Sequence, residues 1–247
     1  MYGRGNTGEV HCYKAGGLVH HESAVERDFF RIMEWDYTVD TFVVQPFQVP
    51  YKRADGRPTT YTPDCFAISY KLFIGTAPKY EPTAFEIKTR DDLRENWEDL
   101  KPKLRAGRNF LAEGGFRFRL LTENRINQVF LTNITFLLKF RGPRFMLRTP
   151  AEAKVIDRLM AYIRGKSDAD FTPREVLDNY GGPETREQVI PWMWNLYADY
   201  VLHCDLLVPL TLDTVSWRRG DAGEGFANAG SPDFRADWRQ PENDWRR

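Results

Sequence analysis

Cysteine is scarce in this sequence of 247 residues: the chain has three, and they lie far apart. Cys12, Cys65 and Cys204 form no CxxC pair, so the sequence lacks the usual half-site of a structural zinc ion. Three well-separated cysteines also make no disulfide framework, which is typical of a protein that works in a reducing cytoplasm.

Long apolar runs are missing as well. No segment approaches the roughly 18 apolar residues needed to cross a bilayer. The first residues, MYGRGNTGEVHCYKAGG, lack the apolar centre of a signal peptide. We therefore expect a soluble cytoplasmic protein with no membrane partner.

The chain also lacks a net charge, because 35 Lys and Arg residues balance 35 Asp and Glu residues. A neutral chain is not expected to coat nucleic acid by charge alone. A DNA enzyme remains possible, since phosphate contacts need only a local basic face. What the chain does have is 42% hydrophobic and 14% aromatic residues, which is enough for a packed core.

The first half of the chain has the pattern of an α/β domain, which we place at 21–122 after an N-terminal arm at 1–20 that has no apolar period. The predicted elements are a helix capped by Ser23, strands at 41–51 and 60–73 joined by a turn at Asp55-Gly56, a short strand at 84–88, a helix at 91–112 and a strand at 116–121. Pro102 is expected to bend or split the long helix.

The second half is mostly helical. Residues 123–140 follow a helical pattern, Thr149-Pro150 and Thr172-Pro173 each start a further helix, and 184–199 is an aromatic helix. Strand-like segments follow within 201–217. Helices followed by a short β-ribbon predict a winged-helix-like domain over 123–217. Residues 218–247 are rich in Gly, Asp, Arg and Pro and predict a disordered tail.

The sharpest chemical pattern is Pro63-Asp64 on one predicted strand and Glu86-Ile87-Lys88 on the next. Side chains two apart on a strand share a face, so Glu86 and Lys88 should point into one cleft. Mg²⁺ prefers carboxylate oxygens and can activate water for phosphodiester hydrolysis. Asp64 and Glu86 are therefore candidate metal ligands, and Lys88 is a candidate for orienting the water. The alternative is a solvated acid–base pair at a strand end.

Glu26 allows two interpretations. In Ser23-x-x-Glu26 it can complete a capping box and satisfy a backbone N–H. It can also enter the cleft from the helix as a third acid, and Glu22, four residues earlier on the same helix face, competes for that role. Spacing alone favours the capping box.

Three arginines are candidates for contacting DNA phosphates. Arg90 follows Lys88 closely, and Arg117 and Arg119 share one face of the last predicted strand. Each can equally be a surface charge.

Taken together, several segments resemble the TnsA family of transposon endonucleases: VHHESAVERDFF, QPFQVPY, YTPD, FEIKTRDDLRENWEDLKPKLRAGRNF and FRFRLLTE. The resemblance covers about residues 18–125 and depends on their order and combination. It implies a restriction-endonuclease-like PD-(D/E)XK fold, with a mixed sheet flanked by helices. The helical region after it resembles, more weakly, the family's C-terminal winged-helix domain.

The family's motifs, carried over, imply a site of Glu26, Asp64, Glu86 and Lys88, with the three acids as metal ligands. This favours the catalytic interpretation of Glu26. The implied function is a Mg²⁺-dependent endonuclease, with Mn²⁺ as a substitute, that cuts the 5′ strands at transposon ends. The implied partners are double-stranded DNA, a DDE-type transposase and, through the C-terminal region, an AAA+ ATPase regulator, in a prokaryotic, nucleoid-associated setting.

Two other functions remain open from the sequence. A free-standing restriction or repair nuclease would use the same residues and cut DNA without partners. A non-catalytic assembly subunit would use the winged helix to bind DNA or the regulator, and it would have no need of Asp64, Glu86 and Lys88 together.

Overall fold

The computed structural model describes residues 6–53, 55–71, 79–142, 148–166 and 170–218. They form two compact units, of which the first ends at Ile126 and the second begins at Asn127. Within these residues, no helix has both the length and the apolar character needed to cross a membrane.

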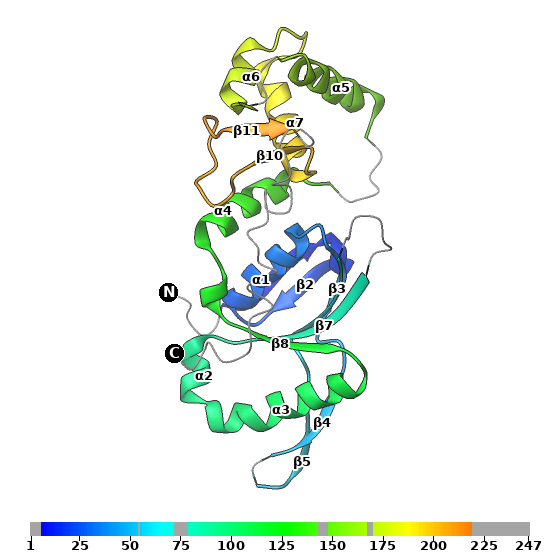
Figure 1. Cartoon of the computed structure of the whole chain (residues 1–247), viewed down its shortest axis with the longest axis vertical. Coiled ribbons are helices and arrows are strands. Elements are labelled where there is room, and N and C mark those ends of the chain that lie inside the picture. The colour runs from blue at the N-terminus through cyan, green and yellow to red at the C-terminus, as the bar shows by residue number, and fades with distance from the viewer. Residues whose placement is uncertain (1–5, 54, 72–78, 143–147, 167–169, 219–247) are drawn as a thin grey trace. The chain divides into compact units, whose positions relative to one another are not determined.

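A four-stranded mixed sheet forms the centre of the first unit (Figure 1). Its strands, in spatial order, are β3 (Val39–Val44), β6 (Cys65–Lys71), β7 (Lys79–Ile87) and β8 (Arg117–Leu121). The first three strands pair antiparallel, whereas β7 and β8 pair parallel. The expected mixed sheet is therefore present, and the helical crossover between β7 and β8 is what makes the last pairing parallel.

Helices cover both faces of this sheet. Helix α1 (Ala24–Trp35) packs on one face, where the rings of Phe29 and Phe85 lie 5.2 Å apart. Helices α2 (Arg90–Glu95) and α3 (Trp97–Glu113) follow β7. Helix α3 packs on the other face, where the ring centres of Phe110 and Phe47 lie 6.0 Å apart. Because side chains alternate along a strand, Phe85 faces α1 and Glu86 faces α3.

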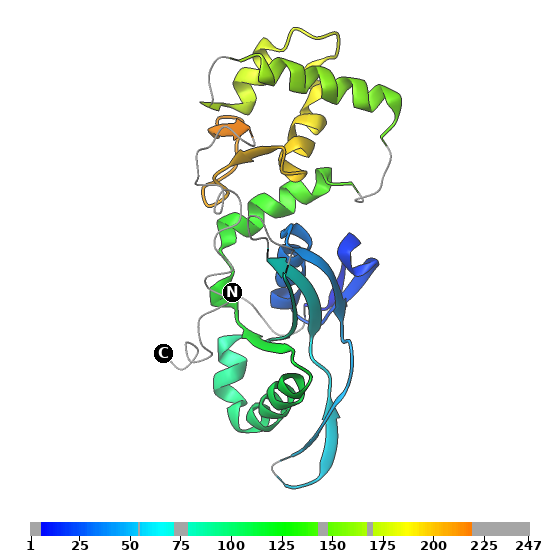
Figure 2. The same cartoon turned by 45° about the vertical axis from the view of Figure 1, so that its right-hand side comes forward.

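Each of the two long predicted strands is interrupted. The segment predicted at 41–51 breaks after β3 at Gln45, which has a φ of 47° before Pro46, and resumes as β4 (Val49–Lys52). The segment predicted at 60–73 breaks at 62–64 between β5 (Pro58–Tyr61) and β6. Strands β4 and β5 form a separate hairpin that projects beyond the sheet (Figure 2). The second break places Asp64 at the start of β6, beside the end of β7.

The predicted long helix divides at Asn96 rather than at Pro102. The Asn96 side chain donates to Asp92 Oδ1 at 2.7 Å, and its backbone N–H closes the last turn of α2. Pro102 lies inside α3, which continues through it. Pro102 has no N–H to donate to the carbonyl of Glu98 four residues earlier, so the helix continues despite the loss of that hydrogen bond.

The prediction of an N-terminal arm without regular structure at 1–20 was wrong for residues 8–20. Strands β1 (Gly8–Cys12) and β2 (Gly17–His21) form an antiparallel hairpin around a 3₁₀ turn, η1 (Tyr13–Ala15). Gly16 and Gly17 make the reversal with φ of 85° and 143°, which favour glycine. Cys12 and Val19 are buried, so the hairpin belongs to the core beside α1.

The second unit is mostly helical, as expected. After a 3₁₀ turn, η2 (Glu123–Arg125), at the end of the first unit, its elements are α4 (Gln128–Leu137), η3 (Leu138–Phe140), α5 (Pro150–Arg164), β9 (Asp170–Phe171), α6 (Pro173–Asn179), α7 (Arg186–Ala198), β10 (Leu202–Cys204) and β11 (Ser216–Arg218). The three strands form an antiparallel sheet in the order β10-β11-β9. The tail predicted at 218–247 lies outside the described residues, apart from Arg218.

The loop between β10 and β11 is held by one buried amide. Asn133 of α4 donates to the carbonyl oxygens of Leu206 at 2.9 Å and Val208 at 2.7 Å. It also accepts from the Leu210 N–H at 3.0 Å. Three hydrogen bonds from one side chain give the loop a defined path.

Candidate active site

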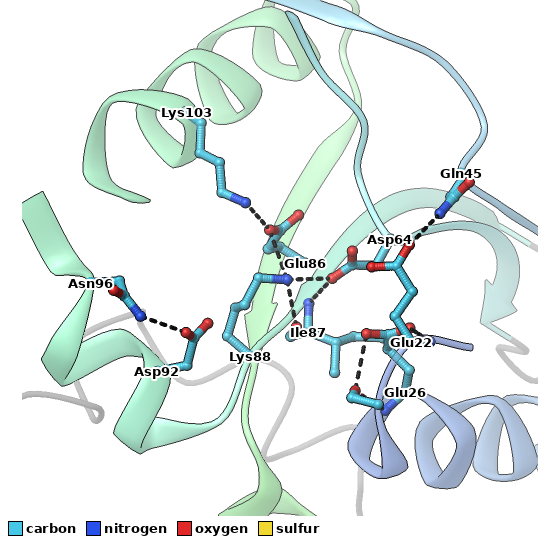
Figure 3. A network of polar contacts seen from close by, with 11 residues as sticks. Glu22, Glu26, Gln45, Asp64, Glu86, Ile87, Lys88, Asp92, Asn96 and Lys103 are labelled. Atoms are coloured by element: carbon cyan, nitrogen blue, oxygen red, sulfur yellow. Dashed lines mark hydrogen bonds and ion pairs between the residues drawn. The ribbon is translucent and has the colours of Figure 1, made fainter. Parts of the chain in front are cut away.

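Asp64, Glu86 and Lys88 meet where β6 starts and β7 ends (Figure 3). Lys88 Nζ lies 3.2 Å from Asp64 Oδ2 and 3.1 Å from Glu86 Oε1, and it donates to the Ile87 carbonyl at 2.9 Å. The Ile87 N–H donates to Asp64 Oδ2 at 2.6 Å. Glu86 and Lys88 therefore share a face, as strand alternation predicts, and β6 supplies Asp64 from the neighbouring strand.

Glu86 is the most enclosed charged group of this cluster, with 1% of its side chain exposed. Its Oε1 contacts two ammonium groups, Lys88 at 3.1 Å and Lys103 of α3 at 2.8 Å. Its Oε2 is buried and has no hydrogen-bond partner among the residues that the structure describes. A buried carboxylate is costly unless it is paired. The two lysines, both at Oε1, therefore stabilise the negative charge of Glu86, and neither of these two contacts involves Oε2.

Burial and neighbouring charges set the protonation of the site. Burial, with the nearby charge of Glu86, raises the pKa of Asp64 to about 7, although Lys88 and the Ile87 N–H oppose the rise. Burial alone would lower the pKa of Lys88, but Asp64 and Glu86 outweigh it and raise that pKa. Lys88 is thus a stable cation, and Asp64 can change its charge near neutral pH. Perturbed carboxyl groups of this kind are typical of functional sites.

Glu26 is placed as a helix cap. Ser23 Oγ accepts from the Glu26 N–H at 3.2 Å, and the Glu26 carboxylate accepts from the Ser23 hydroxyl at 3.0 Å and the Glu22 N–H at 2.8 Å. The charge of Glu26 also contributes to the raised pKa of Asp64, although it is a smaller cause than burial and Glu86. Glu26 therefore acts on the site through its charge, without a direct contact to Glu86 or Lys88 among the described contacts.

Glu22 reaches toward the strained end of β3. Gln45 Nε2 donates to Glu22 Oε1 at 3.3 Å, and the Gln45 N–H donates to the Asp64 carbonyl at 3.1 Å. The φ of 47° at Gln45 is unusual for a residue with a side chain. Strained backbone of this kind is common at functional sites. Here the hydrogen bond from Gln45 to Asp64 connects the end of β3 to the start of β6.

The three candidate arginines lie in different places. Arg90 begins α2 two residues after Lys88, and its N–H donates to Glu123 Oε2 at 2.9 Å. Its Nε is buried and finds no hydrogen-bond partner within the described segments. Arg117 pairs with Glu81 at 3.1 Å near the other end of β7. Arg119 is half-buried and lies opposite Phe85, so it shares the α1 face of the sheet. Of the three, only Arg90 follows directly from the end of β7 that carries the acids.

Lys103 belongs to this site although no motif in the sequence indicates it. It lies between Leu100 and Leu104 on the apolar stripe of α3, and Leu104 and Leu111 are buried. A lysine on the buried stripe of a helix is a signal in itself, because such a cation needs a partner inside the fold. Which partner it finds depends on the packing of α3 against the sheet, which spacing does not reveal.

The donor set is suited to a hard cation. No three His, Cys, Asp or Glu side chains of the described segments are placed to hold a metal ion by themselves. Asp64 and Glu86 nonetheless offer two carboxylates, and Glu86 Oε2, which no described residue contacts by a hydrogen bond, is an oxygen that a cation would satisfy. Mg²⁺ is often bound by one or two carboxylates while water and substrate phosphate complete its coordination.

A comparison with protein families matches residues 36–123 to the model described as the TnsA-like endonuclease N-terminal domain. The chain carries a TnsA-like endonuclease domain. A search of curated proteins finds no match. The match contains Asp64, Glu86, Lys88 and Lys103, whereas Glu26 lies before it.

The TnsA-like domain is a nuclease domain related to the endonuclease subunit of a transposase. Members of the TnsA-like family generally have DNA and a transposase as partners. The match begins at Asp36, just after α1, and ends at Glu123, just after β8. It therefore covers the whole four-stranded sheet with α2 and α3, which are the elements that carry the buried acid and both lysines.

Proposed function

We propose that this chain is a Mg²⁺-dependent DNA endonuclease that cuts the 5′ strands at transposon ends as one subunit of a heteromeric transposase. The observation that carries the proposal is the buried Glu86 carboxylate, which two lysines contact beside Asp64 on the next strand. The TnsA-like domain supports the transposase setting.

Asp64 and Glu86 would hold the ion, with Mn²⁺ as a substitute. A bound Mg²⁺ would supply Lewis-acid stabilisation of the phosphate and a lowered pKa for the attacking water. Lys88 would orient that water and stabilise charge on the phosphate, because its ammonium is already fixed between both acids and the Ile87 carbonyl. Glu26 would be a third acid, and its effect on Asp64 supports this role. Arg90 would contact a neighbouring phosphate, and Arg117 and Arg119 would contact DNA farther from the acids.

Strand cleavage tests this assignment. Asp64→Asn and Lys88→Ala should each lower cleavage of transposon-end DNA by about a thousandfold, since each removes a group from the reacting centre. Cleavage would be measured with Mg²⁺, both for the chain alone and together with a candidate DDE-type transposase partner. Asp55→Asn, at an exposed turn of the same unit, is the matched control and should cleave normally.

Each other outcome has a distinct meaning. Full cleavage by Asp64→Asn or Lys88→Ala would contradict the site. Cleavage by the chain alone, with no gain from the transposase, would indicate a free-standing nuclease. Absence of cleavage by the wild-type chain in every combination would favour a non-catalytic subunit.

For the second unit we propose a winged-helix domain that contacts an AAA+ regulator. From α5 onward the order is helix, strand, helix, helix, strand, loop, strand, with the sheet order β10-β11-β9, and this order supports a winged helix. The loop at 205–215 contains no Lys or Arg and exposes Leu207, Val208 and Val215. Such a loop fits an apolar protein surface better than DNA phosphates.

A further inference from the structure

Lys103 reaches the candidate active site from a helix rather than from the sheet. It lies in the second turn of α3, and its Nζ contacts Glu86 Oε1 at 2.8 Å, closer than the 3.1 Å of Lys88 (Figure 3). Its side chain is 20% exposed, whereas that of Glu86 is 1% exposed. The pair is thus mostly removed from water, where an ion pair is stronger than at the surface.

The surroundings of Lys103 are shaped to hold the ammonium. Its Nζ lies 5.6 Å from the centre of the Tyr61 ring, within the range of a cation–π contact. The Tyr61 ring rests on α3 at Gly107, one turn after Lys103, where a Cβ atom would come within 2.1 Å of Tyr61 Oη. The glycine allows the ring to approach the helix, which brings the ring within reach of the Lys103 ammonium.

Lys88 has no N–H donor left for a water molecule while it also contacts Glu86. A lysine ammonium has three N–H donors. Those of Lys88 face Asp64 Oδ2 at 3.2 Å, Glu86 Oε1 at 3.1 Å and the Ile87 carbonyl at 2.9 Å. If Lys88 is to orient a water molecule, it must release one of these oxygens. Glu86 can be released without becoming an unpaired buried charge only because Lys103 also contacts it.

We propose that Lys103 is a positioning residue of the nuclease site: it holds Glu86 by Oε1, so that Oε2 is directed to the metal ion and Lys88 is available to the attacking water. This inference rests on the proposed nuclease function. It divides the work of the two lysines, with Lys103 acting through Glu86 and Lys88 acting on the reacting groups.

The first experiment measures metal binding without DNA. Calorimetry with Mn²⁺ on the full chain should show about tenfold weaker binding for Lys103→Met, because loss of a group that orients a metal ligand typically costs 10- to 100-fold in affinity or activity. Lys103→Arg keeps the charge and should bind Mn²⁺ nearly as the wild type does. Lys101→Met changes a half-buried lysine of the same helix and is the matched control.

A double-mutant cycle shows whether Lys103 acts through Glu86. In a Glu86→Gln background there is no carboxylate for Lys103 to hold, so Lys103→Met should cause no further loss of Mn²⁺ binding. In cleavage assays at saturating Mn²⁺, Lys103→Met should lower kcat about tenfold and leave the KM for DNA unchanged, and Lys103→Arg should restore most of the rate.

The outcomes separate this inference from the nuclease function. If the wild type binds no Mn²⁺ and does not cleave DNA, the proposed function fails. If the wild type does both, unchanged or tighter Mn²⁺ binding by Lys103→Met overturns the role of Lys103, because the lysine would then only repel the ion. A further loss in the Glu86→Gln background would likewise show that it does not act through Glu86.

Discussion

The two units of this protein bury polar side chains of different kinds. The first unit encloses Glu86 with Asp64 nearby, two carboxylates that disfavour each other's charge. In the described part of the second unit the buried polar side chains are amides, hydroxyls and a histidine, with Asn133 and Asn195 the largest amides. Satisfied neutral groups stabilise a fold, whereas like charges placed together in a protein interior cost stability. The first unit also buries Asp28, Glu34 and Asp36, and these accept from or pair with Arg27, Lys14 and Thr38 in the usual way of structural carboxylates. The pairing of like charges at Glu86 and Asp64 is different, and it indicates chemistry rather than stability.

The largest effect on stability is expected from the second unit. Asn133→Ala removes three hydrogen bonds to the backbone of the loop between β10 and β11. Its free energy of unfolding should fall by about 3 kcal/mol, since buried backbone groups lose their partners. Urea denaturation measures this change. If the proposed AAA+ regulator binds this loop, its co-purification should also be lost in the variant. Thr132→Ala, at the exposed neighbouring position of α4, is the control. A loss no greater than that of the control would remove the contrast between the units.

In the first unit, by contrast, replacing a buried polar side chain, Asp64, is expected to raise the free energy of unfolding. The pKa of Asp64 is raised to about 7 by burial and by Glu86, from an ordinary value of 3.8. Between these two pH values the folded chain keeps a proton that the unfolded chain has released. The free energy of unfolding therefore falls progressively as pH rises from 4 to 7. Asp64→Asn avoids this cost and can still accept from the Ile87 N–H.

The free energy of unfolding of Asp64→Asn should therefore equal that of the wild type near pH 4 and exceed it by on the order of 2 kcal/mol at pH 8 without metal. Urea denaturation across this pH range is the measurement, with Asp55→Asn as the exposed control. Added Mn²⁺ should stabilise the wild type more than the variant, because an ion that binds only the folded state adds to stability. A variant less stable than the wild type at pH 8 would mean that attraction to Lys88 outweighs burial.

The two units also differ in how far their sequences predict them. Side-chain alternation placed Glu86 and Lys88 on one face because a strand repeats every two residues. The helix starts at Ser23, Thr149 and Thr172 were predicted because a capping side chain bonds only to its own helix. These are local rules, and they hold whatever the rest of the chain does.

The errors arise where distant contacts decide. Gln45 takes up a strained backbone and hydrogen-bonds Asp64 and Glu22, so the strand predicted across it ends there. The hairpin at 8–21 has few buried positions, among them Cys12 and Val19, and so shows little apolar alternation. The role of Lys103 becomes visible only when α3 packs near Glu86 in the folded chain. The contacts of Gln45 and Lys103 join segments far apart in sequence, beyond the reach of spacing, whereas the strands of the hairpin are neighbours in sequence.

The smallest effects come from one motif that occurs in both units. Ser23-x-x-Glu26 starts α1, and Thr149-x-x-Glu152 starts α5 with reciprocal hydrogen bonds. Ser23→Ala and Thr149→Ala should each lower the free energy of unfolding by about 1 kcal/mol, which is typical for the loss of a cap. Equal losses, measured by urea denaturation, would show that as caps the two motifs are equivalent.

Replacing each glutamate by glutamine then separates capping from catalysis. Glutamine can accept such hydrogen bonds, since Gln188 accepts from the Thr185 N–H at 2.9 Å at the start of α7, as Glu152 does from Thr149. Glu26 accepts instead from the Glu22 N–H and the Ser23 hydroxyl, which an amide oxygen can also do. Glu26→Gln and Glu152→Gln should both leave stability almost unchanged near neutral pH. Glu26→Gln should nevertheless lower DNA cleavage tenfold or more, because a neutral amide is a poor substitute for an acid beside Asp64, whereas Glu152→Gln should cleave normally. Equal cleavage by both variants would reduce Glu26 to a cap and leave Asp64 and Glu86 as the only acids of the site.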